Sequence, residues 1–350
     1  MPKTLVIRLS ALGDVAMLIP VLYSCAKKYS HEEFLLITKT PLLPIFEHRP
    51  VNVDVLAVDN KQQHKGIFGL KNLIGELSLQ NITKVVDTHD VLRSKVIRTF
   101  FLLKGIKVAH INKERQRQWT LTRKNNKIFH PLHTSFEKYY KVFRQLGYDF
   151  TIDFKSIFEF GTRDFCLIEP LVGQKSGIWI GIAPFAKHLG KIYPFERMQE
   201  VVEKLASDSD KKIFLFGGEE ETTQLSQLSA LSPNIISVAG KLSFSTELLL
   251  MSYLDIMLTM DSGNMHLASL VATPVVSIWG ATHPYAGFYG YGQKEENAIQ
   301  ANLSCRPCSI YGNKPCYKNS YECLTLITPA MIVERVNSSL SHRFESEHCR

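Results

Sequence analysis

The feature that most constrains this chain is a repeated alternation of short β-branched runs with longer amphipathic stretches. The runs have the length and composition of buried strands, at 4–9, 34–38, 53–58, 84–87, 106–110, 177–183, 211–216, 235–238, 256–260 and 275–279. Helical stretches separate them, at 15–29, 67–79, 91–103, 135–146, 195–207, 220–231, 245–252 and 263–271. Strands that alternate with helices build βαβ units, so we expect parallel sheets with helices on both faces.

The alternation falls into two sets, one in each half of the chain. The weakest stretch between them is 164–176, which contains Glu169-Pro170 and Gly173. We therefore predict an α/β protein of two doubly wound, Rossmann-like domains, over 1–165 and 176–325, facing each other across a cleft. Ligands of such sheets bind where the carboxyl ends of the strands meet helix N-termini.

Charge is divided unevenly between these halves. The 350 residues contain 41 Lys and Arg and 33 Asp and Glu, a net charge of +8. Residues 1–160 hold 25 basic and 14 acidic side chains (+11), and residues 161–350 hold the remaining 16 and 19 (−3). The stretch from Arg93 to Lys127 has eleven Lys or Arg and a single acid, Glu114. It is either a solvated face or a surface for an anionic polysaccharide, lipid headgroup or nucleic acid.

Composition and the N-terminus exclude several classes of protein. With 45% hydrophobic and 21% charged residues, the chain is neither disordered, nor collagen-like, nor a small disulfide-stapled scaffold. The apolar run at 5–7 is too short for a signal peptide, and no stretch approaches the roughly 18 apolar residues of a spanning helix. We therefore expect a cytoplasmic protein whose basic half allows peripheral contact with the membrane face.

The first candidate site follows the first predicted strand, at Arg8-Leu9-Ser10-Ala11-Leu12-Gly13-Asp14. The segment matches neither the dinucleotide-binding nor the P-loop pattern. Asp14 stands at the start of a helix, where an aspartate commonly serves only as a cap. It is also where a general base of a cleft would stand. Spacing alone favours the cap.

Two strand-to-helix loops of the second half carry charged candidates. The loop after 177–183 contains Lys187, His188 and Lys191, which suit a diphosphate unless they are incidental solvated side chains. The loop after 211–216 contains two glycines and then Glu219-Glu220-Glu221. Acids there complement a helix dipole, or one carboxylate accepts hydrogen bonds from ribose hydroxyls.

The segment Met260-Asp261-Ser262-Gly263-Asn264-Met265-His266 favours function over a purely structural role. Asp261 ends a predicted strand, and Ser262 and Gly263 open the next helix, whose N–H groups are then free for phosphate. The structural alternative makes Asp261 an N-cap and His266 a core histidine. The clustering of Ser262, Gly263 and His266 at one helix start argues against that alternative.

Four of the seven cysteines lie close together in the sequence, as Cys305-x2-Cys308-x7-Cys316-x6-Cys323. Four thiolates can hold zinc, but only the first pair has the usual C-x-x-C spacing. Free buried thiols or opportunistic disulfides are the alternatives. We expect no metal, and keep the zinc site as the minor alternative.

Together, these segments resemble glycosyltransferase family 9, the ADP-heptose:lipopolysaccharide heptosyltransferases. The resemblance runs from Thr4 to about Val336 and is most specific over 8–20 and 260–283, where D-[ST]-G-x-x-H-[LI]-A stands at 261–268. It implies a GT-B fold and an inverting, metal-independent transfer without cofactor. It also implies ADP-heptose as donor and a lipopolysaccharide-core or related cell-envelope glycan as acceptor. Residues 326–342 then form a C-terminal helix that returns to the first domain.

The resemblance also implies the roles of individual residues. Asp14 is the base for the acceptor hydroxyl, and Lys191 stabilises the departing ADP. The donor is bound by the second half, with the diphosphate on Ser262, Gly263 and His266, the sugar hydroxyls on Asp261, the ribose on Glu221 and the adenine on Leu242. Where the family often has Thr or Ser pairs, this chain has Ala186 and Lys187. Lys187 then supplies charge in place of hydroxyls.

Two rival functions remain at this stage. The same fold could use another nucleotide sugar. Alternatively, the basic half could belong to a non-enzymatic protein that binds anionic surfaces or nucleic acid, but this leaves the 261–266 helix start and Lys191 without a role. We therefore expect a nucleotide-sugar donor and a glycan acceptor as partners, and no nucleic acid. The acceptor surface is expected within the Arg93 to Lys127 stretch.

Overall fold

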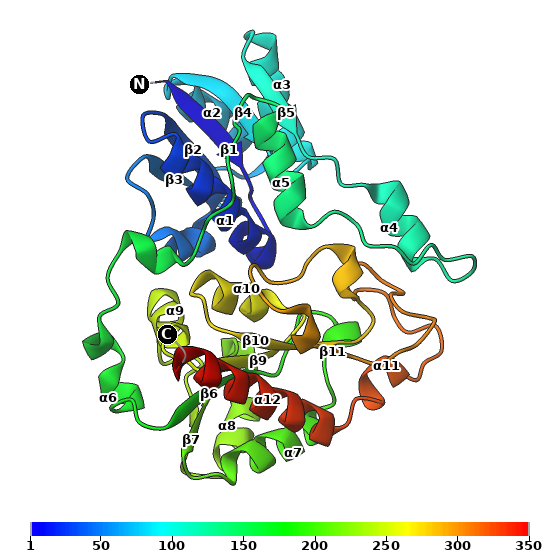
Figure 1. The fold of residues 1–350 in the computed structure, drawn as a ribbon. Coiled ribbons are helices and arrows are strands. Elements are labelled where there is room, and N and C mark those ends of the chain that lie inside the picture. Colours follow the sequence, from blue (N-terminus) through cyan, green and yellow to red (C-terminus); the bar gives the residue numbers. More distant parts are fainter. Residues whose placement is uncertain (1, 349–350) are drawn as a thin grey trace. The chain divides into compact units, whose positions relative to one another are not determined.

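A computed structural model describes residues 2–348, with side chains as far as residue 341. The chain forms two compact units (Figure 1). Unit 1 comprises residues 1–113 and 133–162, and unit 2 comprises residues 114–132 and 163–350. The chain therefore leaves unit 1 for one short segment of unit 2 before it completes unit 1.

Unit 1 is a five-stranded parallel sheet in the order β3-β2-β1-β4-β5. Its strands are β1 (Lys3–Ile7), β2 (Glu33–Lys39), β3 (Val53–Val58), β4 (Ile82–Asp87) and β5 (Lys107–His110). Its helices are α1 (Leu12–Lys28), α2 (Gly66–Ser78), α3 (Leu92–Leu103) and α5 (Ser135–Arg144). One core packs α2 and α3 onto the sheet through Leu73, Leu77, Ile97 and Phe101.

Unit 2 is a six-stranded parallel sheet in the order β11-β10-β9-β6-β7-β8. Its strands are β6 (Ile178–Ala183), β7 (Lys211–Leu215), β8 (Ile235–Ser237), β9 (Ile256–Met260), β10 (Val275–Trp279) and β11 (Ala298–Gln300). Its helices are α4 (Arg115–Thr122), α6 (Glu169–Val172), α7 (Phe195–Ala206), α8 (Thr222–Ser229), α9 (Phe244–Met251), α10 (Gly263–Leu270), α11 (Glu322–Thr325) and α12 (Pro329–His348).

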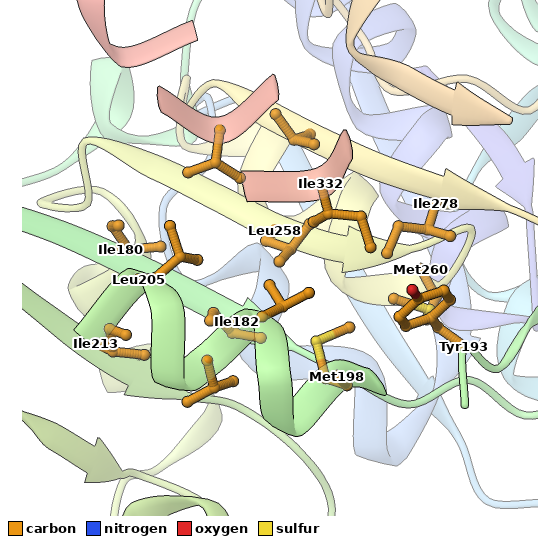
Figure 2. Close-up of a cluster of buried hydrophobic side chains, with 14 of the residues drawn as sticks. Ile180, Ile182, Tyr193, Met198, Leu205, Ile213, Leu258, Met260, Ile278 and Ile332 are labelled. Carbon is orange, nitrogen blue, oxygen red and sulfur yellow. The ribbon is translucent and has the colours of Figure 1, made fainter. Parts of the chain in front are cut away.

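The core of unit 2 lies between its sheet and helices α7 and α12. Figure 2 shows Met198 and Leu205 of α7 and Ile332 of α12 against side chains of β6, β7, β9 and β10. Ile332, Val336 and Leu340 recur every four residues and are at most 3% exposed, which explains why this face of α12 is buried. The helix expected over 326–342 thus has its buried side chains in the core of unit 2. Its return to the first domain stays a prediction.

The two sheets share one strand order, which is that of a Rossmann fold. In each, the order reverses between the first and fourth strands of the unit, namely β1 and β4 in unit 1 and β6 and β9 in unit 2. The predicted two parallel α/β sheets are confirmed. Crevices at such reversal points are where open α/β sheets bind ligands, so the loops after these four strands are where a site is expected.

Candidate active site

In unit 1, the reversal point brings Arg8 and Asp14 together after β1. Arg8 Nη2 lies 2.6 Å from Asp14 Oδ2, and the amide of Ala11 donates to the same oxygen at 3.2 Å. Asp14 is in the first turn of α1, whose N-cap residue is Ala11, so its carboxylate reaches back to the cap backbone. Among the described residues, no donor reaches Asp14 Oδ1. The carboxylate is therefore oriented through one oxygen, while the other is available to take a proton.

Two further groups hold this arrangement in place. The Arg8 guanidinium lies 5.6 Å from the centre of the Tyr139 ring, and the Tyr139 hydroxyl donates to the backbone oxygen of Asp14 at 3.3 Å. Arg8 Nη1 also donates to the backbone oxygen of Thr88, directly after β4. Arg8 thus ties the loop after β1 to the loop after β4.

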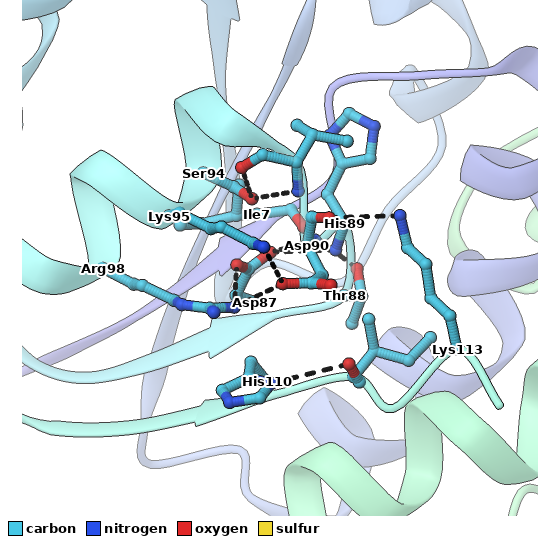
Figure 3. A network of polar contacts seen from close by, with 12 residues as sticks. Ile7, Asp87, Thr88, His89, Asp90, Ser94, Lys95, Arg98, His110 and Lys113 are labelled. Atoms are coloured by element: carbon cyan, nitrogen blue, oxygen red, sulfur yellow. Dashed lines mark hydrogen bonds and ion pairs between the residues drawn. The ribbon is translucent and has the colours of Figure 1, made fainter. Parts of the chain in front are cut away.

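The loop after β4 carries a polar network that the sequence analysis missed. Figure 3 shows Arg98 and Lys95 of α3 reaching the carboxylates of Asp87 and Asp90. Asp87 is fully buried; it accepts from the amides of His89 and Asp90 at 2.9 Å and pairs with Arg98 Nη1 at 2.9 Å. The signal for it was the run Asp87-Thr88-His89-Asp90, four polar residues that begin at the last residue of a buried strand.

His89 connects this network to the β1 loop as a neutral imidazole. Its Nδ1 accepts from the amide of Leu9 at 3.3 Å. Burial, with smaller effects of Arg8 and Lys113, lowers the pKa of His89 to about 4. The ring is therefore uncharged at neutral pH, as its acceptor role requires.

In unit 2, the reversal point brings Lys191 and Asp261 together. Lys191 Nζ lies 2.8 Å from Asp261 Oδ2, and the two side chains are 15% and 4% exposed. Lys191 comes from the loop after β6, and Asp261 directly follows β9, the neighbouring strand. An ammonium group has three donors, so one ion pair leaves Lys191 able to bind a further anion.

The start of α10 is built as an anion-binding helix end. Ser262 is the N-cap residue, yet its side chain makes no capping hydrogen bond; its hydroxyl lies 3.1 Å from that of Thr259. The first N–H groups of the helix therefore have no capping side chain, which favours an anionic ligand there. His266, one turn further on, is buried. Asp261 is not the N-cap, so the structural alternative for this residue is wrong.

Glu221 and Leu242 occupy the next two strand ends. Glu221 follows β7 in a 3-10 turn (Glu219–Glu221), and its Oε2 accepts from the amide of Gly218 at 2.8 Å. Burial raises its pKa. Leu242 is half-buried between β8 and α9. Since the strands lie in the order β9-β6-β7-β8, the predicted donor residues follow one another along a single edge of the sheet.

Lys187 belongs to the Lys191 loop, the name used here for residues 184–194 between β6 and α7. It lines a cavity of about 290 Å³ with His188, Gly190, Lys314 and Tyr321, among others. The side chains that line this cavity include no acid. Desolvation, with Lys191 and Lys187 nearby, lowers the pKa of His188. The predicted cationic character of this loop is thus extended by Lys314.

The basic stretch is shared between the units. Arg93 to Lys113 belong to unit 1, whereas Glu114 to Leu132 belong to unit 2. In the second part, Trp119 is 60% exposed and the Arg123 guanidinium lies 5.1 Å from its ring centre. Ile128 is 54% exposed. Its backbone amide donates to the backbone oxygen of Thr120 at 3.0 Å, which links the two ends of the 120–128 segment.

The four clustered cysteines, Cys305, Cys308, Cys316 and Cys323, are free thiols. Among residues 2–341, whose side chains the structure describes, no group of three or more His, Cys, Asp or Glu side chains is arranged to hold a metal ion. No helix between residues 2 and 348 is long and apolar enough to cross a membrane.

Comparison with known proteins decides the family. Residues 70–317 match the family model of glycosyltransferase family 9 (heptosyltransferase). The chain belongs to this family. Lipooligosaccharide heptosyltransferase 2 of Campylobacter jejuni is 20% identical over 335 residues, 93% of this chain and 95% of that protein.

Solved structures share the fold of this family 9 glycosyltransferase. The family 9 glycosyltransferase of Veillonella parvula superimposes with a TM-score of 0.74 at 19% identity, covering 97% of this chain and 98% of that one. The E. coli heptosyltransferase WaaC with ADP has a TM-score of 0.69 at 17% identity, covering 96% and 99%. The fold is therefore GT-B, as the resemblance implied.

Proposed function

We propose that this protein transfers heptose from ADP-heptose to a lipopolysaccharide-core or related cell-envelope glycan, with inversion at the anomeric carbon and without metal. The observation that carries the proposal is the order of polar and apolar groups along the carboxyl edge of the unit 2 sheet. That order matches the order of chemical groups in a nucleoside-diphosphate sugar.

The donor lies along this edge. Neighbouring strands are about 4.8 Å apart, so the four strand ends span roughly 14 Å, comparable to an extended nucleoside diphosphate. The diphosphate binds the N–H groups at Ser262 and Gly263, with His266 and Lys191. The ribose lies on Glu221 and the adenine on Leu242, while Asp261 faces the heptose hydroxyls. The relative WaaC, solved with ADP, supports adenine as the base.

The transfer step needs one base and one leaving-group cation. The acceptor hydroxyl gives its proton to Asp14 Oδ1 as its oxygen bonds to the anomeric carbon, and the bond from that carbon to the diphosphate oxygen breaks. ADP leaves with the electron pair of that bond, and Lys191 with the α10 amides neutralises the developing charge. Attack opposite the leaving group inverts the configuration. Because these groups supply the positive charge, the step needs no divalent cation.

We assign the acceptor to the N-terminal domain (1–165) and the donor to the C-terminal domain (176–325). The stretch from Arg93 to Lys127 supplies cations for a phosphorylated acceptor. Trp119, Ile128 and Arg123 combine exposed apolar surface with positive charge, the chemistry of contact with an anionic membrane face. This supports a cytoplasmic enzyme that is peripheral at the membrane.

The test is transfer profiling with ADP-, UDP- and GDP-sugars and a truncated core acceptor, followed by NMR of the product. We expect turnover with ADP-heptose, an anomeric configuration opposite to that of the donor, and no loss of rate in EDTA. ADP should also raise the melting temperature more than UDP or GDP. Preference for a UDP-sugar would replace the heptose assignment with the rival donor, and retention of configuration would contradict the base mechanism.

A further inference from the structure

Arg306 is a buried arginine that has no assigned role and is linked to the Lys191 loop through residues 279–282. Arg306 is 4% exposed, and its guanidinium donates to the backbone oxygens of Gly280 (2.5 Å), Ala301 (2.7 Å), Thr282 (2.9 Å) and Trp279 (3.0 Å). Among the described residues, no carboxylate pairs with it. Carbonyl dipoles compensate its positive charge, and three of them come from residues 279–282, the last residue of β10 and the turn after it, called here the 279–282 turn.

That turn is in direct contact with the Lys191 loop. The amide of Ala281 donates to the backbone oxygen of Gly190 at 2.8 Å. The approach is so close that a Cβ on Gly280 would lie 2.4 Å from the same Gly190 oxygen. The residue after Gly190 is Lys191, whose ammonium pairs with Asp261.

Loop 305–312 holds the other side of this contact. The amide of Cys308 donates to the backbone oxygen of Ala281 at 3.0 Å, and Gly312 packs against the stem of Lys191, where a Cβ would lie 2.6 Å from Cγ. Lys127 Nζ donates to the backbone oxygens of Cys305 (2.7 Å) and Pro307 (2.9 Å), on either side of Arg306. Lys127 thus holds the residues on both sides of Arg306 in place.

We propose that Arg306 is a positioning residue for Lys191: by gathering the carbonyls of the 279–282 turn, it sets the place of Gly190 and hence of the Lys191 ammonium. A planar guanidinium with five donors can bond carbonyls that converge from several directions, whereas a lysine has three donors on one atom. Without the guanidinium, buried carbonyls are left unpaired, and the turn must move to find partners. This inference rests on the proposed leaving-group role of Lys191.

The first measurement is kcat and KM for ADP-heptose in Arg306→Lys. Lys191 contacts the diphosphate in the bound donor but stabilises it most as ADP leaves and its charge increases. Its displacement should therefore lower kcat about tenfold to hundredfold and raise KM less, by no more than about threefold. The matched control is Arg197→Lys, since Arg197 Nη1 also donates to two backbone oxygens of unit 2, those of Thr325 and Ile327. This control should keep kcat. An unchanged kcat in Arg306→Lys would overturn the proposal.

A double-mutant cycle separates positioning from general structural damage. If Arg306 acts through Lys191, Arg306→Lys should lower kcat little further when Lys191 is already Met. Full additivity of the two losses would contradict the proposal. If Arg306→Lys does not fold, Gly190→Ala takes its place. The added Cβ would lie 2.9 Å from the Cβ of Ala281 and would push apart the Lys191 loop and the 279–282 turn.

Hydrogen exchange tests the inference without any transfer assay. Amides of the 187–193 and 279–283 segments should exchange faster in Arg306→Lys than in wild type. In Arg197→Lys their exchange rates should equal those of wild type. If wild type transfers no heptose yet exchange rises at both segments, the proposed function fails and the positioning role stands. If exchange does not rise, the positioning role fails whatever the activity.

Discussion

The reversal points of the two sheets use the same topology for opposite electrostatic purposes. In unit 1, the charges are paired with one another: Arg8 with Asp14, and Arg98 with Asp87 and Asp90. In unit 2, one ion pair, Lys191–Asp261, stands beside helix N–H groups that have no capping side chain. Unit 1 thus presents an oriented carboxylate, and unit 2 presents unsatisfied donors. A shared fold therefore does not set the charge of the ligand, which depends on the loops after two strands.

The largest expected effect is on the carboxylate of unit 1. Asp14→Asn keeps an oxygen for Arg8 and Ala11 but removes the proton acceptor, so transfer should fall about 10²- to 10⁴-fold. The affinity for ADP, measured calorimetrically, should stay within about twofold because we assign the nucleotide to unit 2. Asp54→Asn, at an exposed carboxylate of β3, is the control. Normal turnover in Asp14→Asn would remove the base role.

The next effect is on the cation of unit 2. Lys191→Met should lower the transfer rate roughly 10²- to 10³-fold, as the loss of a leaving-group donor does, and unlike Asp14→Asn it should also weaken ADP binding. It leaves Asp261 buried and unpaired, so the free energy of unfolding should also fall, by about 3 kcal/mol. Lys318→Met, at an exposed lysine of the same unit, should change neither quantity. Equal ADP affinity in Lys191→Met and wild type would place the diphosphate elsewhere.

Both units contain a buried neutral histidine, which predicts a shared response to acid. Burial and neighbouring cations lower the pKa of His89 in unit 1 and of His283 in unit 2 from 6.5 to about 4. The unfolded chain then binds more protons below pH 6.5. Each histidine's contribution to stability is therefore fully present above pH 6.5 and is lost as the pH falls toward 4.

The measurement is urea unfolding at pH 7.5 and pH 5. The free energy of unfolding should fall between pH 7.5 and pH 5, and each histidine should account for about 2 kcal/mol of this fall. In His89→Gln the fall should therefore be smaller by about 2 kcal/mol. His31→Gln, at an exposed histidine, should leave the dependence unchanged. The same slope in His89→Gln and wild type would show that the imidazole is not held neutral.

The smallest effect is expected where the two units share the basic stretch. Arg115→Gln with Lys124→Gln removes two exposed charges from the 114–132 segment, and each exposed charge contributes little. We expect KM for a phosphorylated acceptor to rise about two- to fivefold, with kcat and donor KM unchanged. Lys61→Gln with Lys71→Gln, exposed in unit 1, is the matched control. A larger rise in donor KM would assign the segment to the donor instead.

Local patterns were sufficient for most of the fold. Each predicted strand coincides with an observed one to within two residues, because buried parallel strands are continuous apolar runs that a sequence displays directly. Two elements were not predicted from the sequence, the three-residue edge strand β11 and the polar helix α4, because neither has a sustained apolar face. Asp261, Ser262 and Lys191 could be proposed as site residues because strand ends and helix starts are also local features.

The tertiary structure alone decided how charge and loops are distributed. By sequence halves the charge is +11 and −3, but by units it is +7 (20 basic, 13 acidic) and +1 (21 basic, 20 acidic), since residues 114–132 carry five basic side chains and one acid into unit 2. Lys191 and Asp261, which form an ion pair, are 70 positions apart in the sequence. Arg306 is 24 to 27 positions from the three residues of the 279–282 turn whose carbonyls it bonds. No periodicity encodes such contacts, because they depend on which strands become neighbours in the sheet. The sequence by itself therefore determined the elements and the candidate residues, and the strand order determined which of them meet.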